Sequence, residues 1–183
     1  MFQYAISQNL ALALLTPQDA DALFSLTDDS RAHLREWLPW LDATQSPQHT
    51  RGFIETGLRQ FADNQGFQTG IWYEGRLAGC IGLHAIDWPN RSTTMGYWLG
   101  RDFQGHGLMT QAATAVVNIV FQRYQLNRID IRAAQGNLRS QGVAKRLGFW
   151  QEGVIRQAEW LYDHYVDHVL YAMLREYWGA GHA

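Results

Sequence analysis

The sequence predicts an α+β fold built on a mostly antiparallel β-sheet. Apolar residues recur at helical spacing in several segments, most clearly over residues 108–124. Apolar runs separated by tight turns follow one another over residues 67–99, as in antiparallel strands. A helix separates the strand-like run that ends at Leu99 from the one that begins at Asn127, so we expect one parallel crossover within the sheet.

The N-terminal third of the chain predicts one strand followed by helices. The apolar run over residues 10–15 ends at Thr16, a residue type that caps helices, and Pro17 suits the first helical position. The expected helices lie over residues 17–28, 31–38 and 47–63. The second helix is expected to end before Pro39, because proline disfavours helical backbone in the residue before it.

The rest of the chain predicts most of the sheet and two more helices. Strands are expected over residues 67–73, 76–86, 92–99, 127–133, 149–161 and 165–174, the last two forming a terminal hairpin. Helices are expected over residues 108–124 and 137–147, and Gly148 closes the second because glycine accepts a left-handed backbone. No repeat or linker divides the chain, so we expect one domain over residues 1–183.

Composition excludes several classes of function. With 15 Lys and Arg against 17 Asp and Glu, the net charge is -2, and no basic run suits a nucleic-acid partner. No apolar stretch approaches the ~20 residues that cross a bilayer, and residues 1–15 lack the pattern of an export signal. The lone Cys80 can form neither an internal disulfide nor a zinc cage. We therefore expect a cytoplasmic protein without a membrane or metal.

Residues 100–110, Gly-Arg-Asp-Phe-Gln-Gly-His-Gly-Leu-Met-Thr, join a predicted strand to the clearest predicted helix. Glycines at 105 and 107 let a ligand approach the backbone, and the unpaired amides of a first helical turn attract an anion. No Lys follows the glycines, as a nucleoside-triphosphate loop requires, and Thr110 stands where a dinucleotide loop has its third glycine. Two glycines alone also suit an ordinary loop that starts a helix.

Motifs on both sides of this loop give the chain a family resemblance. They are Gly-Tyr-Trp-Leu at 96–99, Gln-Gly-His-Gly at 104–107, Leu-Asn-Arg at 126–128, Asn137 with Ser140, Leu-Gly-Phe at 147–149 and Glu-Gly at 152–153. In this order and spacing they resemble the GNAT acetyltransferases, and most closely the branch that acetylates the N-terminal serine or alanine of ribosomal proteins. The resemblance implies about seven strands in a twisted sheet that is splayed in the middle, with helices on both faces.

The resemblance also implies how acetyl-coenzyme A is held. The family loop wraps the pyrophosphate mostly through backbone N–H groups, and here it comprises Gln104, Gly105, His106, Gly107, Leu108, Met109 and Thr110. Met109 departs from the small residue that is commonest at its position. The pantetheine arm lies between the splayed strands, where the main chain of Trp98 and Leu99 would hydrogen-bond it. Asn137 matches a position that binds the coenzyme near its thioester, and it is also a natural helix cap.

Catalytic roles follow from the same resemblance, with one departure. Ser140 matches the residue that returns a proton to the departing thiolate, and Ala144 stands where many family members carry a tyrosine. The branch uses a glutamate to accept the proton of the amine, but this chain has Thr94 there, whose hydroxyl can position a water and is not a useful base. We rank His84 first as the replacement base, with Asp87 as an alternative that equally suits a turn.

The acceptor is expected to enter opposite the coenzyme, along a slot lined by Trp37, Trp40, Trp160 and Tyr162, although aromatic side chains also pack cores. We expect an enzyme that acetylates a protein N-terminal amine by direct attack. A small amine or polyamine is the alternative acceptor. The missing carboxylate at Thr94 also leaves open a catalytically silent sensor of acyl-coenzyme A. A homodimer is compatible with the family.

Overall fold

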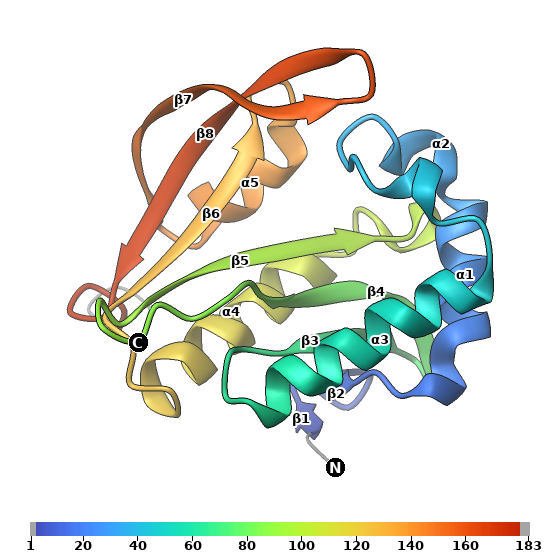
Figure 1. Ribbon diagram of the computed structural model, residues 1–183. Helices are drawn as coiled ribbons and strands as arrows, with labels where there is room; N and C mark the ends of the chain where they lie inside the picture. Colours follow the sequence, from blue (N-terminus) through green and yellow to red (C-terminus); the bar gives the residue numbers. More distant parts are fainter. Residues whose placement is uncertain (1–2, 180–183) are drawn as a thin grey trace.

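A computed structural model describes residues 3–179, so the first two residues searched for an export signal lie outside the described part. One mixed sheet of eight strands runs through the molecule in the order β1-β2-β3-β4-β5-β6-β8-β7 (Figure 1). The strands are β1 Gln3–Ala5, β2 Leu10–Leu14, β3 Gln68–Tyr73, β4 Arg76–Leu83, β5 Ser92–Leu99, β6 Arg128–Ala134, β7 Trp150–Leu161 and β8 His164–Leu174. The sequence predicted about seven, and the extra one is β1, which is too short to show a period.

Helices cover both faces of the sheet, as expected. They are α1 Ala20–Asp29, α2 Arg31–Leu34, α3 Pro47–Ala62, α4 Leu108–Gln122 and α5 Leu138–Arg146, with short 3-10 turns at η1 Pro17–Asp19, η2 Leu41–Ala43 and η3 Arg101–Phe103. Helices α1 and α3 pack on one face and α4 on the other (Figure 1). Helix α2 ends at Leu34 and not at residue 38. A turn over residues 35–37 follows, in which Trp37 N–H donates to the Leu34 carbonyl three residues back at 3.0 Å.

The main core lies between the sheet and α4. The stripe predicted on this helix is buried, and its members are Ala112, Ala115, Val116, Ile119 and Val120. A smaller cluster under α1 and α3 includes Leu23, Ile54 and Cys80. Both faces of β4 are therefore covered, and every residue of this strand after Arg76 is buried. This buried strand pairs with β5, which carries several candidate site residues.

The sheet opens between β5 and β6. Their parallel pairing begins at Ser92↔Arg128 and ends at Met95↔Ile131. Beyond that point β5 stays paired with β4 as far as Leu99, while β6 continues beside β8 as far as Ala134. Figure 1 shows the two strands diverging from a common end. The predicted splay is thus confirmed, and it leaves the inner edges of both strands without a strand partner.

Candidate functional site

The glycine loop, residues 104–110, leads from η3 into α4. Gly105 and Gly107 have φ angles of 82° and 72°, in the left-handed region that other residues adopt only with strain. A β-carbon at Gly105 would meet no atom within 4 Å, and one at Gly107 would reach only the Gln111 side chain at 4.0 Å. Backbone conformation, and not lack of space, therefore requires glycine at these two positions.

The amides of residues 105–110 have no hydrogen-bond partner in the described part of the chain. Arginines stand beside them: Arg139 Nη1 donates to Gln104 Oε1 at 2.6 Å, and Arg146 Nε donates to Thr110 Oγ1 at 3.1 Å. The side chains of Leu108 and Met109 are buried in the core, so only their backbone faces a ligand. A helix N-terminus with successive free N–H groups and flanking cations fits a pyrophosphate.

The β4–β5 ladder decides which backbone groups face the splay. Gly100 N–H donates to Ala78 C=O at 2.8 Å, and His84 N–H donates to Thr94 C=O at 2.8 Å. Backbone direction alternates along a strand, so Trp98 also turns its N–H and C=O toward β4. The inner edge of β5 is formed by Tyr97 and Leu99. Tyr97 and Leu99 thus turn their backbone toward the gap, whereas Trp98, for which a main-chain role was expected, turns its backbone toward β4.

A cavity of about 890 Å³ lies at the open part of the sheet, and we call it the central cavity. Side chains or backbone of seven sequence-predicted site residues line it, namely Trp37, Trp40, His84, Thr94, Trp98, Asn137 and Ser140. Five further lining residues have ionisable side chains and had no role predicted from the sequence, namely His49, Tyr97, Arg132, Glu159 and His168. Only Tyr97 stood inside a recognised motif, and the others have no local signal.

His84 faces this cavity over Gly96. A β-carbon on Gly96 would come within 2.9 Å of His84 Nε2, so glycine makes room for the imidazole. Partial burial first, and the charge of Arg132 second, lower the pKa of His84 below its usual range. The imidazole is therefore neutral near pH 7 and can accept a proton. Asp87 instead accepts hydrogen bonds from Asn90 in an exposed turn, outside the cavity lining, as its alternative reading expected.

Ser140 lies at the start of α5, on the other side of the cavity. The Asn137 side chain accepts a hydrogen bond from Ser140 N–H at 3.0 Å, which confirms the predicted helix cap. Ser140 Oγ donates to Tyr97 Oη at 3.2 Å, and that phenol donates to the Ser140 carbonyl at 3.1 Å. Burial raises the pKa of Tyr97 to about 12, so its phenol keeps its proton. Tyr97 thus fixes the position of Ser140.

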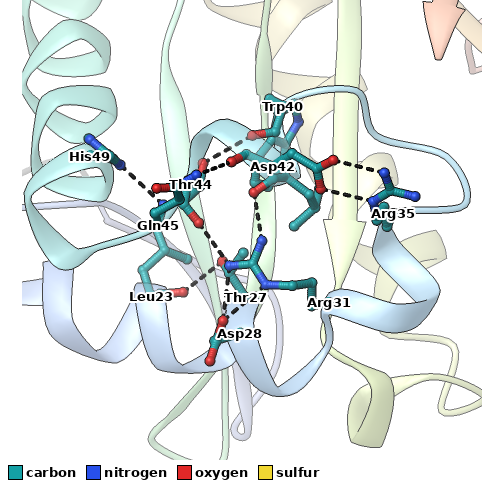
Figure 2. Close-up of polar contacts among 11 residues, drawn as sticks. Leu23, Thr27, Asp28, Arg31, Arg35, Trp40, Asp42, Thr44, Gln45 and His49 are labelled. Atoms are coloured by element: carbon teal, nitrogen blue, oxygen red, sulfur yellow. Dashed lines mark hydrogen bonds and ion pairs between the residues drawn. The ribbon is translucent and has the colours of Figure 1, made fainter. Parts of the chain in front are cut away.

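The α2–α3 loop, residues 35–46, forms the wall that carries Trp37 and Trp40. Figure 2 shows how it is fastened: Arg31 donates to the carbonyls of Leu41 at 2.6 Å and Thr44 at 2.8 Å. Arg35 makes a two-point ion pair with Asp42, with both contacts at 2.8 Å. Trp40 packs against Trp98 with ring centroids 6.1 Å apart. These contacts hold two aromatic side chains at the cavity.

Trp160 and Tyr162 do not line the central cavity, contrary to the slot expected from the sequence. Trp160 is 51% exposed, and its ring packs edge-on against that of Tyr165 with centroids 4.8 Å apart. Tyr162 has a φ of 63° in the hairpin turn, and its hydroxyl donates to the Leu38 carbonyl at 2.5 Å. The Arg35 guanidinium lies 3.8 Å from the centre of its ring. Tyr162 therefore joins the terminal hairpin to the α2–α3 loop and is not part of the cavity lining.

Other properties of the described residues limit the chemistry of the site. Burial raises the pKa of the Cys80 thiol well above its usual range, so this cysteine remains protonated and is buried as expected. Within residues 3–179, no group of three His, Cys, Asp or Glu side chains is placed to hold a metal ion. No helix in that range is both long and apolar enough to span a membrane.

Comparison with known proteins agrees with this geometry. The family model of the acetyltransferase (GNAT) domain matches residues 9–150. A ribosomal-protein-serine acetyltransferase of Escherichia coli (strain K12) is 31% identical over 169 residues, covering 92% of this chain and 94% of that protein. The ribosomal protein uS5-alanine N-acetyltransferase of the same strain is 33% identical over 181 residues, covering 96% and 92%.

A solved structure with a similar fold holds the coenzyme. It is RimL, a ribosomal L7/L12 alpha-N-protein acetyltransferase in complex with coenzyme A. The TM-score is 0.91 at 28% identity, and the match covers 94% of this chain and 98% of that chain. This chain therefore has the fold of an acetyltransferase that has been solved with coenzyme A bound.

Proposed function

Because this chain belongs to the GNAT acetyltransferase family, we propose that it acetylates the N-terminal amine of a ribosomal protein with acetyl-coenzyme A. The names of two relatives that match nearly the whole chain support this acceptor. The observation that carries the proposal is the combination of free amides at the glycine loop with a neutral imidazole and a serine hydroxyl in the central cavity.

The glycine loop suits the pyrophosphate of acetyl-coenzyme A. Its donors are the N–H groups of residues 105–110, and Arg139 holds the side chain of Gln104 against the loop. The main chain of Tyr97 and Leu99 faces the gap in the sheet and would bind the pantetheine arm. Donors that are fixed before the reaction stabilise developing charge on a thioester oxygen, since they need no reorganisation.

His84 and Ser140 divide the proton chemistry. An amine must lose its proton before it attacks a carbonyl, and the lowered pKa of His84 keeps its imidazole available for that proton. Thr94 lines the same cavity and would orient the water that carries the proton. On the other side, the Ser140 hydroxyl, which donates to Tyr97 Oη in this structure, would turn its proton to the departing sulfur and then regain a proton from water. The bond to nitrogen then forms as the bond to sulfur breaks.

An assay of thiol release tests this proposal. The protein is mixed with acetyl-coenzyme A and a short peptide that has a free N-terminal serine or alanine, and the peptide mass is measured. We expect free thiol and acetylated peptide in equal amounts, and neither with the same peptide blocked at its N-terminus. Turnover with spermidine alone would identify a small-amine acetyltransferase. Coenzyme binding in calorimetry without turnover of any amine would identify a silent sensor.

The proposal extends to where and how the protein works. We infer one acyltransferase domain over residues 1–183, a cytoplasmic location and a homodimer. Ribosomal proteins are the acceptors of the named relatives, which supports the location. Trp150, the first residue of the edge strand β7, and Tyr177 are exposed, and their rings stack with centroids 5.4 Å apart. This exposed aromatic pair supports a surface that contacts the second subunit. Size-exclusion chromatography with light scattering gives the molar mass of the protein in solution. A monomer at every protein concentration would contradict the homodimer.

A further inference from the structure

The first turn of α5 is hydrogen-bonded to both halves of the splayed sheet. Ser140 Oγ donates to the phenol oxygen of Tyr97, on β5, at 3.2 Å. The next residue in the helix is Gln141, and its Oε1 accepts from the hydroxyl of Tyr171, on β8, at 3.1 Å. Strand β8 lies beyond β6, on the far side of the gap from β5. Two consecutive residues of α5 therefore connect the two halves of the sheet.

The carboxamide of Gln141 is buried, and its hydrogen bonds are made. Its side chain carries a polar group in a residue that is only 5% exposed. Nε2 donates to the carbonyl of Gln135 at 2.8 Å and to that of Ala134, the last residue of β6, at 3.2 Å. A buried polar group without partners is costly, so the three hydrogen bonds define one position for this side chain. Gln141 thereby fixes the start of α5 against the end of β6.

Tyr171 is held in turn by the sheet. It is 1% exposed, and its strand pairs on both sides, with Ile131 of β6 and Gln151 of β7 opposite it. The phenol oxygen also lies 3.4 Å from Gln151 Oε1, but a phenol has a single proton and Gln141 is nearer. The Tyr171 hydroxyl is therefore a donor in a fixed place, aimed at Gln141.

Gln141 faces a different direction from Ser140. Neighbouring residues of a helix project about 100° apart, and Ser140 lines the central cavity whereas Gln141 is not in its described lining. The Ser140 hydroxyl has one proton, so it gives up its bond to Tyr97 when it donates to sulfur. The hydrogen bonds of Gln141 take no part in that chemistry and persist through it. They can therefore hold the turn while Ser140 reacts.

We propose that Gln141 and Tyr171 are positioning residues that hold the Ser140 hydroxyl where the departing sulfur needs its proton. This inference rests on the proposed function, since it takes Ser140 as the acid. A reacting group displaced by about 1 Å can lose about 100-fold in rate. Neither positioning side chain belongs to the glycine loop or to the described cavity lining. Their loss should therefore slow the turnover of bound substrates and leave the binding of both substrates nearly unchanged.

Steady-state kinetics of Tyr171→Phe and Gln141→Met tests the proposal. The first change removes one hydroxyl, and the second removes all three hydrogen bonds at similar side-chain size. We expect kcat to fall about fivefold in Tyr171→Phe and about 20-fold in Gln141→Met, with both KM values within about twofold of the wild type. Two controls should change nothing. Gln151→Met removes only the longer contact of Tyr171, and Tyr124→Phe removes a half-buried hydroxyl beside Phe67.

The same changes in a Ser140→Ala background separate positioning from general support of the fold. If Gln141 and Tyr171 act through Ser140, each change should lower the residual kcat by less than about twofold, because no acid is left to position. Losses as large as those in the wild-type background, or an unchanged kcat in Tyr171→Phe, would overturn the positioning role. Tyr171→Phe carries the test if thermal unfolding shows that Gln141→Met is not folded at the assay temperature.

Failure of this inference is distinguishable from failure of the proposed function. The thiol departs whichever amine attacks, so the cycle of variants is run with the amine that the wild type acetylates. The expected cycle with spermidine as the only acceptor would overturn the ribosomal acceptor and leave the positioning role standing. Turnover of the peptide with equal losses in both backgrounds would do the reverse. No turnover of any amine by the wild type would overturn both.

Discussion

The glycine loop and the central cavity present their ligands with different parts of the chain. The loop offers backbone N–H groups from consecutive residues, and the side chains of Leu108 and Met109 are buried in the core. The cavity offers side chains from strands β4, β5, β6, β7 and β8 and from several helices and loops. A site made of consecutive amides depends on backbone conformation, whereas a site made of side chains depends on which residues the fold brings together. The two regions should therefore respond differently to substitution.

The largest effect is expected in the cavity, from Ser140→Ala. Loss of a general acid should lower kcat about 100-fold. The KM for acetyl-coenzyme A should change little, because the loop amides are untouched. The steady-state rate of thiol release at saturating acetyl-coenzyme A and peptide gives kcat. Ser25→Ala, on the exposed side of α1, is the matched control. An unchanged kcat would remove Ser140 from the mechanism and leave the cavity without an acid.

His84→Gln should produce the next largest loss. At neutral pH roughly a tenth of an α-amine is already neutral, so reaction without a base persists and kcat/KM should fall about 30-fold. Raising the pH toward 9 deprotonates the free amine and should bring the variant closer to the wild type. The pH dependence of kcat/KM for peptide is the measurement. Equal losses at every pH would mean that His84 only supports the cavity wall.

Gly107→Ala tests the loop and should act on the coenzyme alone. A side chain at φ 72° costs about 1 to 2 kcal/mol. We expect the KM for acetyl-coenzyme A to rise about tenfold, with the KM for peptide unchanged. Gly52→Ala provides the control, since its β-carbon would also meet open space and its φ is not in the left-handed region. Equal effects of both changes would show that the left-handed conformation is not required.

The smallest effect is a shift of the pH profile in Arg132→Gln. His84 must be neutral to act, so kcat/KM falls as the pH drops through its pKa, which lies below the usual value of about 6.5. Arg132 is the second cause of that lowering, after burial. Its removal should raise the pKa and move the acidic limb to higher pH, with little change at pH 8. A limb that moves to lower pH would contradict the assignment of His84 as the base.

Much of the fold followed from local patterns. Helical spacing over residues 108–124 predicted α4 and its buried stripe, because apolar residues recur on the helix face that packs against the sheet. The short β1 and the early end of α2 were missed, since three residues carry no period and the helix end depends on loop contacts. Resemblance to a family supplied the splay between β5 and β6, which no local pattern encodes.

By itself the sequence determined the glycine loop, since the left-handed glycines and the start of the helix depend on residues that are adjacent in the chain. His84, Thr94 and Ser140, which the sequence and its family resemblance named as candidates, line one cavity in the structure. Only the tertiary structure decided that Tyr97 holds Ser140 and that Trp160 and Tyr162 stand outside the cavity. The same is true of the contact between Glu159 and His168, at 3.5 Å, which forms beside a register shift between Ile155 and Glu159 in β7. Such contacts join residues far apart in the chain, and pairing register sets them after the strands have met.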